Sequence, residues 1–296
     1  MSLNRPVWKL RDWIDINKLN FEWLSKNENA INLLEMNLNK INWKMLSRNP
    51  NAIELLERNQ EKIDWYWLSG NKNAIKLLEK NLEKIDWYML SKNPNAIKIL
   101  KENKDKIEWS GLSLNRNAIE LLIDNQEKID WSYLSSNPSA IKILEENIEK
   151  IDWKFLSMNE NAIELLMKNR EKIDWYYLST NPNAIKLLEN NEDDISWIEL
   201  SKNWNGLGIL EKNQEKIFWL YLSLNRNPEI MDLLKNNQER IDWHYFSTNP
   251  LIFELDYETM KRNNEEMEEE LIKEIMKPSR VFKNPDYDYI EELFGD

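Results

Sequence analysis

The sequence contains no cysteine, one histidine and only five glycines in 296 residues. Without cysteine the chain can form neither disulfides nor thiolate metal sites, so its stability must come from packing. So few glycines leave no glycine-rich phosphate loop, and neither a metal-ligand cluster nor a nucleophile elbow is found. We therefore expect a noncatalytic protein with no cofactor and no metal site.

The charge balance argues against two classes of partner. The formal net charge is −12 and the pI is about 4.9, whereas nucleic acids and anionic membranes recruit basic surfaces. No apolar run approaches the roughly 20 residues that span a bilayer. Arg5, Lys9 and Arg11 interrupt any signal-peptide core near the N-terminus. We expect no nucleic-acid binding, no membrane insertion, no secretion by a signal peptide and an intracellular location.

What the sequence does contain is a motif of about 22 residues repeated in tandem. Its tryptophan stands at Trp43, Trp65, Trp87, Trp109, Trp131, Trp153, Trp175, Trp197 and Trp219, and Phe21 holds the same position one step earlier. The spacing lengthens by two residues before Trp243, within the stretch Asn225 to Ile230. A fixed period in this range is typical of solenoids, in which each unit stacks on its neighbours. We expect the tryptophans to form the buried spine of that stack.

One unit, Ser47 to Leu68, predicts two short helices. Asn49 followed by Pro50 favours a helix start, and the helix is expected to end near Asn59. Its apolar stripe comprises Ala52, Ile53, Leu55 and Leu56. A second helix, capped by Asp64, is expected over residues 65–68. Helices this short do not persist alone, so the pattern predicts an all-α fold, a right-handed α-solenoid of ten to eleven two-helix repeats.

Two further residue types recur with the same period. An alanine, expected at close helix crossings, stands at Ala30, Ala52, Ala74, Ala96, Ala118, Ala140, Ala162 and Ala184. An asparagine, expected to cap helices and to bond to adjacent turns, stands at Asn27, Asn49, Asn71, Asn93, Asn115, Asn137, Asn159, Asn181, Asn203 and Asn225. One unit departs from the pattern, because Gly206 replaces the alanine. There either the stack bends or Trp204 is presented to a partner.

Both ends of the array depart from the repeat, as expected of a solenoid that must cover its terminal hydrophobic faces. We expect a short N-terminal cap over residues 1–20, a repeat solenoid over residues 21–248 and a helical C-terminal cap over residues 249–296. Within the C-terminal cap, a helix is expected over residues 257–277, ended by Pro278 and followed by a short helix.

The most informative variation lies just after each tryptophan, where two positions change from unit to unit. We take these positions as a candidate partner-binding ribbon, because aromatic residues and methionine are enriched at protein interfaces. Its members are Tyr66, Trp67, Tyr88, Met89, Tyr133, Phe155, Tyr176, Tyr177, Tyr221 and Tyr245. The alternative is that the second residue of each pair is half-buried between units. His244 occupies one of these positions and is expected to be a surface residue rather than a catalytic or metal-binding one.

The tandem segments NPNAI, LLExN and KIDW, over about residues 20 to 250, resemble a multi-copy family of repeat proteins encoded by giant DNA viruses of protists and algae. The segment IFELDY, Ile252 to Tyr257, looks like the closing element of that family. The segment KPSRV, Lys277 to Val281, departs from a family pattern that has histidine before the proline. The resemblance implies a viral origin and carries no catalytic motif to this chain.

These observations lead to a functional expectation. We expect a noncatalytic repeat scaffold for viral or host protein partners, acting as a minor capsid or internal component of a large virion. The alternative is a host-directed adaptor in infected cells, with a carbohydrate-binding module or an enzyme subunit as weaker candidates. The expected locations are the host cytoplasm or the virion.

Overall fold

The structure is a computed structural model that describes residues 6–275. Its backbone forms two compact units, Leu10–Phe253 on the one hand and Met1–Lys9 with Glu254–Asp296 on the other. These limits differ from the boundaries expected after residues 20 and 248, because residues 10–20 and 249–253 take part in the repeat array. The helix break at Pro278 and the helix expected after it lie outside the described residues.

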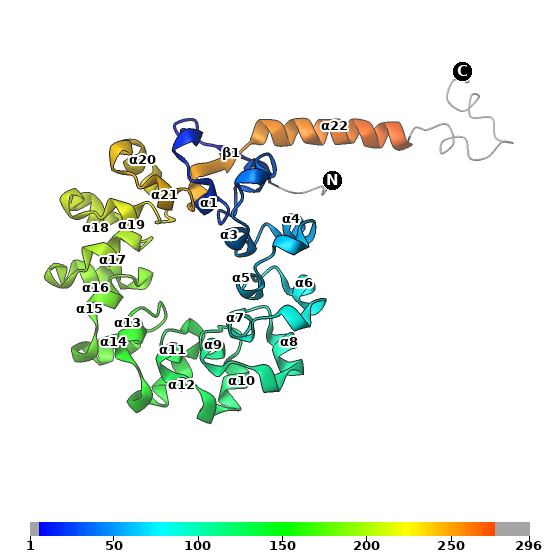
Figure 1. Ribbon diagram of the computed structural model, residues 1–296. Coiled ribbons are helices and arrows are strands. Elements are labelled where there is room, and N and C mark those ends of the chain that lie inside the picture. The colour runs from blue at the N-terminus through cyan, green and yellow to red at the C-terminus, as the bar shows by residue number, and fades with distance from the viewer. Residues whose placement is uncertain (1–5, 276–296) are drawn as a thin grey trace, which may run out of the picture. The chain divides into compact units, whose positions relative to one another are not determined.

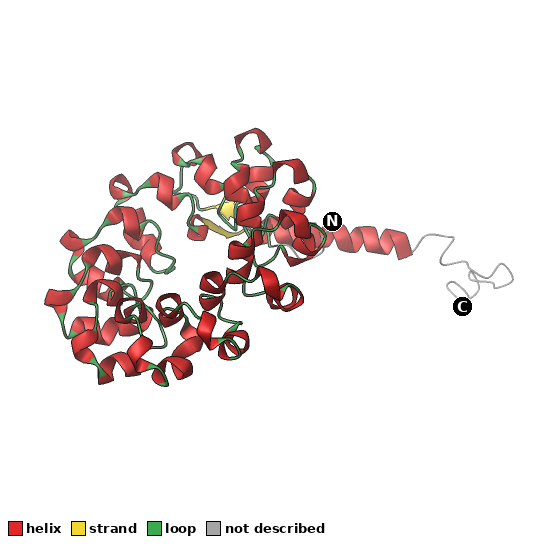
Figure 2. Ribbon diagram, turned by 60° about the horizontal axis from the view of Figure 1, so that its bottom comes forward, coloured by secondary structure: helices red, strands yellow, loops and turns green. Residues whose placement is uncertain are grey.

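The unit Leu10–Phe253 consists of short helices in two layers (Figures 1 and 2). The inner-layer helices begin at the repeated aromatic residue: α1 (Phe21–Leu24), α3 (Trp43–Ser47), α5 (Trp65–Ser69), α7 (Trp87–Lys92), α9 (Trp109–Ser113), α11 (Trp131–Ser135), α13 (Trp153–Ser157), α15 (Trp175–Leu178), α17 (Trp197–Lys202), α19 (Trp219–Leu222) and α21 (Trp243–Phe246). The outer-layer helices follow the inner ones: α2 (Ile31–Glu35), α4 (Ile53–Glu57), α6 (Ile75–Glu79), α8 (Ile97–Glu102), α10 (Ile119–Ile123), α12 (Ile141–Glu145), α14 (Ile163–Lys168), α16 (Ile185–Glu189), α18 (Leu207–Lys212) and α20 (Ile230–Lys235). The all-α solenoid predicted from the sequence is confirmed.

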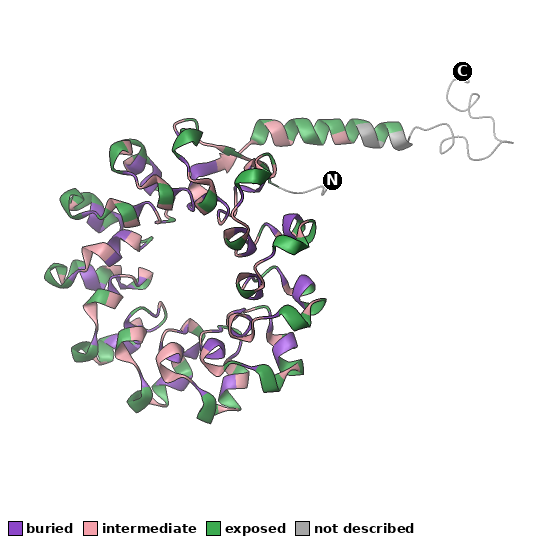
Figure 3. Ribbon diagram, in the orientation of Figure 1, coloured by how far each residue is buried: buried purple, intermediate pink, exposed green. Residues whose placement is uncertain are grey.

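The core lies between the two layers. Successive inner helices pack against each other from α3 to α15, and Figure 1 places α3, α5 and α7 nearer the centre than α4, α6 and α8. Buried residues form a band between the layers (Figure 3). The repeated alanines lie in that band with at most 1% of their surface exposed, each directly before an outer helix.

Local hydrogen bonds explain where the helices begin and end. The Asp64 carboxylate accepts from the backbone N–H of Trp67 at 3.2 Å, as predicted for a cap. The outer helix begins at Ile53 rather than at Asn49, because the chain first makes a turn there. It ends where the side-chain amide of Asn59 donates to the carbonyl of Leu55 at 2.9 Å.

A 3-10 helix connects each outer helix to the next inner one. These segments are η2 (Leu38–Lys40), η3 (Gln60–Lys62), η4 (Leu82–Lys84), η5 (Lys104–Lys106), η6 (Gln126–Lys128), η8 (Ile148–Lys150), η9 (Arg170–Lys172), η11 (Glu192–Asp194), η12 (Gln214–Lys216) and η13 (Gln238–Arg240). Two more, η7 (Pro138–Ala140) and η10 (Pro182–Ala184), precede outer helices, and η14 (Pro250–Ile252) precedes a strand. The last cation of a connecting segment lies over the aromatic ring that begins the preceding inner helix, as Lys62 at the end of η3 does over Trp43 of α3 at 4.6 Å.

The tryptophans are not the buried spine that the sequence suggested. Their rings are half-buried, and all except Trp175 have one face against a lysine or arginine, whereas Leu68 and its equivalents three residues after the aromatic residue are fully buried. An indole that carries a cation on its face must stay near water, because the ammonium group is strongly hydrated. The buried spine is formed instead by leucine, alanine, serine and asparagine.

The repeated asparagine joins neighbouring units. The side-chain amide of Asn115 donates to the carbonyls of Ser91 and Asn93 in the preceding unit, at 2.9 and 2.8 Å. Its oxygen accepts from the N–H of Asn117 at 3.0 Å. The same three bonds recur at every repeated asparagine from Asn49 to Asn225, except that Ser139 supplies the N–H in one unit. We call this series the asparagine ladder.

A serine forms a second connection between units. The Ser47 hydroxyl, at the end of inner helix α3, donates to the carbonyl of Trp43 at 2.8 Å. It also accepts from the N–H of Asp64, which caps the next inner helix α5, at 3.0 Å. Within the described residues, no buried side-chain nitrogen or oxygen lacks a hydrogen-bond partner. The buried polar atoms of this core are therefore fully satisfied, as a stable buried network requires.

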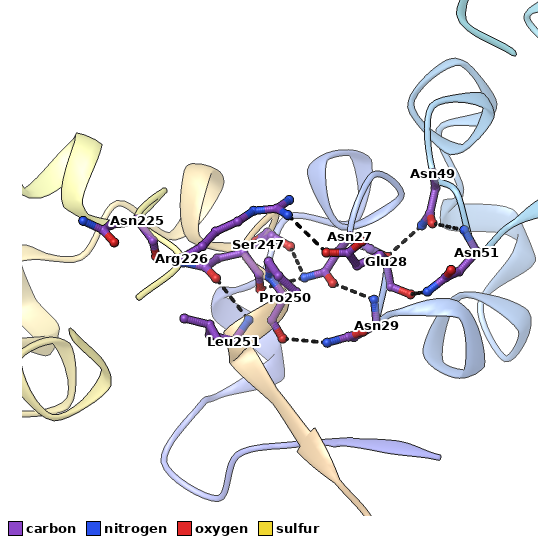
Figure 4. Close-up of polar contacts among 11 residues, drawn as sticks. Asn27, Glu28, Asn29, Asn49, Asn51, Asn225, Arg226, Ser247, Pro250 and Leu251 are labelled. Atoms are coloured by element: carbon purple, nitrogen blue, oxygen red, sulfur yellow. Dashed lines mark hydrogen bonds and ion pairs between the residues drawn. The ribbon is translucent and has the colours of Figure 1, made fainter. Parts of the chain in front are cut away.

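The first and last units of the array bond to each other (Figure 4). The amide of Asn27 donates to the carbonyls of Ser247 and Asn249 at 3.0 and 2.8 Å, which repeats the ladder geometry across the two ends. The N–H of Asn20 likewise donates to the Ser247 hydroxyl at 2.9 Å. Counting Asn249, the ladder has eleven asparagines and closes into a ring. The ends that we expected to be covered by caps instead cover each other.

The eleventh unit is assembled from both ends of the array. Its inner helix α21 and its turn at Asn249 come from one end, and its connecting segment η1 (Ile16–Lys18) comes from the other. Lys18 lies over the Trp243 ring at 4.9 Å, which is the contact that a lysine or arginine makes with the repeated aromatic ring of every other unit except that of Trp175. Trp13 stacks on Phe246 with ring centroids 6.0 Å apart, in place of an outer helix.

Two short strands, β1 (Trp8–Leu10) and β2 (Phe253–Leu255), pair with each other. The pairing is antiparallel, since the N–H of Arg11 bonds to Ile252 and the N–H of Asp256 bonds to Val7. The second compact unit contains the helix α22 (Tyr257–Ile275), which agrees with the helix expected over residues 257–277. The Asp256 carboxylate accepts from the N–H and the hydroxyl of Thr259 at the start of that helix, and these bonds lower its pKa.

Units that depart from the repeat still form the hydrogen bonds of the asparagine ladder. A Cβ at Gly206 would lie 2.9 Å from the Leu200 side chain, yet α18 is a regular helix and Asn225 still bonds to Asn203 at 2.9 Å. Trp204 is 52% exposed. The two additional residues before α20 are accommodated in the turn, where Asn249 still bonds to Asn225 at 2.7 Å.

Ring closure predicts that Asn27→Ala destabilises the protein as much as Asn115→Ala. Each change leaves one buried carbonyl, that of Ser247 or Ser91, without a donor and removes one of two donors from a second carbonyl, which costs about 2 kcal/mol. Thermal unfolding followed by circular dichroism measures the loss. In an open array Asn27 would have no preceding unit, so an unchanged melting temperature for Asn27→Ala would contradict closure. Asn117→Ala, which removes an exposed bond, is the control.

A second prediction concerns Trp175, because Asp194 replaces the usual cation in its unit. The other repeated aromatic rings, Phe21 included, each carry a lysine or arginine 4.3 to 5.2 Å from the centroid. Asp194→Lys should therefore stabilise the fold by about 0.5 to 1 kcal/mol. Asp193→Lys makes the same charge change beside it, so equal melting temperatures for the two variants would refute the cation–π account.

Candidate binding surface on the inner face of the ring

The candidate ribbon lies on the inner side of the ring. Leu68 and Ser69 of α5 are fully buried toward the outer layer. Residues along a helix are separated by about 100°, so Tyr66 and Trp67 fall on the opposite side. Because α5 belongs to the inner layer, that side faces the inside of the ring (Figure 1). The same geometry holds for the two positions after the repeated aromatic residue in every unit.

The two positions of the ribbon have different surroundings. The first is the more open one, since Tyr66 and Tyr176 are 45% and 49% exposed. The second is half-buried and contacts neighbouring units, as the Phe155 ring does with Tyr133 at 6.1 Å and with Tyr177 at 6.4 Å. The half-buried alternative therefore holds for the second position, whereas the first position is more exposed to solvent. The remaining ribbon members, Trp67, Tyr88, Met89, Tyr221 and Tyr245, are also half-buried.

Sequence reasoning missed two further rows of residues, which flank the ladder asparagine. The residues before it are Lys26, Arg48, Gly70, Lys92, Leu114, Ser136, Met158, Thr180, Lys202, Leu224 and Thr248. The residues after it are Glu28, Pro50, Lys72, Pro94, Arg116, Pro138, Glu160, Pro182, Trp204, Arg226 and Pro250. The sequence signal that could have identified them is the one that identified the ribbon. These positions vary from unit to unit, whereas the other residues of the turn recur.

Ion pairs locate these rows at the smallest radius of the ring. Arg116 reaches Glu160 at 3.3 Å although a whole unit lies between them. Arg226 reaches Glu28 at 3.2 Å with the eleventh unit between them (Figure 4). Units are closest together near the ring axis, so pairs that skip a unit form there.

The flanking rows adjoin the ribbon. The Arg48 guanidinium lies over the Trp67 ring at 4.0 Å, and Lys202 lies over the Tyr221 ring at 4.3 Å. Lys154, a residue in the first position of the ribbon, lies over Tyr177 at 4.9 Å. We call these four rows together the inner face: the two positions after each repeated aromatic residue and the two that flank each ladder asparagine.

Two tyrosines of the inner face, Tyr176 and Tyr88, have raised pKa values. The Tyr176 hydroxyl donates to Glu199 at 2.9 Å, and this bond raises the Tyr176 pKa. Burial is the main cause that raises the pKa of Tyr88, and Tyr133, beyond the intervening unit, raises it further. Gly111 lies between them, where a Cβ would come within 2.7 Å of the Tyr88 carbonyl. The missing side chain allows α9 to approach α7.

Three cations converge where the ring closes. Burial is the main cause that lowers the pKa of Lys26, and the charges of Arg48 and Arg226 lower it further. Burial also lowers the pKa of Arg48. The inner face therefore concentrates positive charge at this point.

His244 lies on the inner face beside the point of closure. It is exposed, as expected for a surface residue, and its Nδ1 accepts from the side-chain amide of Asn20 at 3.1 Å. Within residues 6–275, no group of three or more His, Asp or Glu residues is placed to hold a metal ion. No helix in that range is long and apolar enough to cross a membrane.

The tyrosine group predicts a pH effect. The raised pKa of Tyr176 favours its protonated form in the folded state, so this stabilisation is present below pH 10 and is lost as the pH rises above it. Glu199→Gln should return the Tyr176 pKa toward its ordinary value of 10.0. Phenolate absorbance recorded against pH measures the shift, with Tyr176→Phe identifying the band. Identical titrations of the parent and Glu199→Gln would contradict the assignment.

With this geometry established, comparison with known proteins gives no family: no family model, no curated protein and no solved structure matches the chain.

Proposed function

We propose that the protein is a noncatalytic scaffold that holds a protein partner against the inner face of its ring. The observation that supports this most is the distribution of variation. Residues of the core and the ladders recur in nearly every unit, whereas residues of the four inner-face rows change from unit to unit. A surface with a fixed frame and variable side chains is what repeat proteins use for recognition.

The chemistry of the inner face suits a protein partner. Tyrosine, tryptophan and arginine dominate the residues that contribute most to binding at protein interfaces. Tyr66, Tyr176 and Trp204 are each at least 45% exposed and therefore offer contact area in the unbound protein. Their neighbours in the second ribbon position are held by contacts between units.

Closure of the ring supports the same function. Each unit is fixed on both sides by the asparagine ladder, including the two units at the ends. The rows of the inner face are therefore held in one arrangement before a partner arrives. Preorganisation of this kind lowers the entropic cost of binding.

The biological setting that we propose is a large DNA virus, on the basis of the sequence resemblance. Two versions follow, a structural component of the virion and an adaptor in the infected host cell. Mass spectrometry of purified particles distinguishes them, with host-cell fractions as the comparison. Absence of the protein from particles together with abundance in infected cytosol would refute the structural version.

The scaffold function predicts that Tyr66→Ala combined with Tyr176→Ala reduces partner recovery at least tenfold without lowering the melting temperature by more than a few degrees. The two side chains are exposed, so their loss removes contact area and little packing. Affinity capture with the tagged full-length chain, followed by quantitative mass spectrometry, measures recovery. The matched control is Leu82→Ala with Ile148→Ala, which removes exposed apolar residues from the connecting segments. Equal recovery by both double variants would refute the inner face as the binding surface.

A further inference from the structure

Charge is segregated between the inner face and the rest of the molecule. The four rows contain nine cations and four carboxylates, a net charge of +5, in a chain whose formal net charge is −12. The remaining positions therefore carry −17. The cations are Lys26, Lys44, Arg48, Lys72, Lys92, Arg116, Lys154, Lys202 and Arg226, and the carboxylates are Glu22, Glu28, Glu160 and Glu199.

Most of the carboxylates are already occupied. Glu28, Glu160 and Glu199 each hold a cation of the inner face, at 3.2, 3.3 and 2.7 Å. In contrast, six of the cations have no carboxylate partner among the described residues: Lys26, Lys44, Arg48, Lys72, Lys92 and Lys154. The unbalanced charge is therefore available to a ligand.

Like charges that crowd together are costly unless an anion joins them. Lys26 experiences the positive charges of Arg48 and Arg226, and of these two only Arg226 is paired with a carboxylate, that of Glu28. A carboxylate from a ligand would relieve this repulsion and would be only partly screened by salt at a half-buried site. The free protein thus retains electrostatic energy that an acidic partner releases.

The arrangement of the aromatic rings decides between two kinds of acidic partner. Single-stranded nucleic acid is bound by aromatic faces on which bases stack. Here the faces of Trp67, Tyr177 and Tyr221 are occupied by Arg48, Lys154 and Lys202. These three rings are therefore not free platforms for bases. The carboxylates of a ligand need only cations to pair with, and the contacts with the aromatic rings hold these cations in place.

We infer that the inner face binds an acidic polypeptide segment, with aspartate and glutamate side chains on its cations and apolar side chains on its exposed aromatic residues. This inference rests on the proposed function and names the chemistry of the partner. Arg48, Lys72 and Lys92 lie in three successive units and supply a row of charges for the carboxylates. Tyr66 lies in the same region, and Tyr176 and Trp204 lie farther along the ring.

Fluorescence anisotropy with the full-length protein tests the inference. The probe is a labelled 16-residue peptide of glutamate, aspartate, leucine and tyrosine, and the comparison peptide has glutamine and asparagine in place of the acids. We expect the acidic peptide to bind at least tenfold more tightly than the neutral one. Its binding should weaken at least tenfold between 50 and 500 mM salt, as expected for charge pairing. Oligo(dT) of the same length should bind more weakly than the acidic peptide.

Matched variants localise the binding. Arg48→Gln, Lys72→Gln and Lys92→Gln together should weaken binding of the acidic peptide at least tenfold. Lys76→Gln, Lys80→Gln and Lys98→Gln remove the same charge from exposed positions of the outer layer and should change binding less than twofold. Arg48 packs on Trp67, so circular dichroism checks folding. Lys72→Gln alone, at an exposed position, serves as a second variant and should weaken binding about threefold.

Three results would overturn the inference: no binding of the acidic peptide, equal loss in the inner and outer variants, or tighter binding of oligo(dT). None of them refutes the scaffold function, which is judged by partner recovery with the Tyr66 and Tyr176 variants. If that recovery falls while charge removal has no effect, the scaffold function stands and the acidic partner does not.

Discussion

The hydrogen bonds of the asparagine ladder are the constraint on which the rest of the structure depends. Each amide donates to two carbonyls of the preceding unit, and the serine carbonyl of each pair would otherwise be buried without a donor. Because a side chain of fixed length makes these bonds, it also sets the separation between neighbouring units at the turn. The helices are too short to persist by themselves, so they form only where the ladder and the leucines bring the units together. Curvature then arises because the turns are held close while the outer helices, at a larger radius, are spaced more widely.

The sequence predicts what is local and periodic. The 22-residue period, the two helices, the buried alanines and the bonding role of the asparagines follow from the repeat itself. Ring closure does not, because it depends on a small rotation between units, which no single residue encodes. A clue was nonetheless present: Lys18, Leu19 and Asn20 precede Phe21 as lysine, isoleucine and aspartate precede tryptophan in a unit. The segment that we expected to be a cap therefore contains the end of a repeat.

The candidate site was predictable in part for a similar reason. Residues after the tryptophan were noticed because aromatic variation stands out, whereas cations beside the asparagine are inconspicuous in a chain with a net charge of −12. The net charge of the whole chain does not reveal a positive surplus on the inner face, because that face contains only a small share of the charged residues. Only the fold brings Lys26 near Arg226, which are 200 positions apart in the sequence. Argument from composition excluded basic surfaces for the molecule as a whole, but it does not apply to one face of it.

The split eleventh unit also restricts how this protein can change. An open solenoid gains or loses a repeat by adjusting only the interfaces beside it, so repeat number varies readily. Here every unit supplies an eleventh of a full turn, and the last unit is completed by residues from both ends. Inserting or deleting one unit would alter the angle at all the other interfaces, or leave Asn27 without the carbonyls of Ser247 and Asn249. The number of units is therefore a property of the whole ring, whereas substitutions on the inner face leave every interface between units in place.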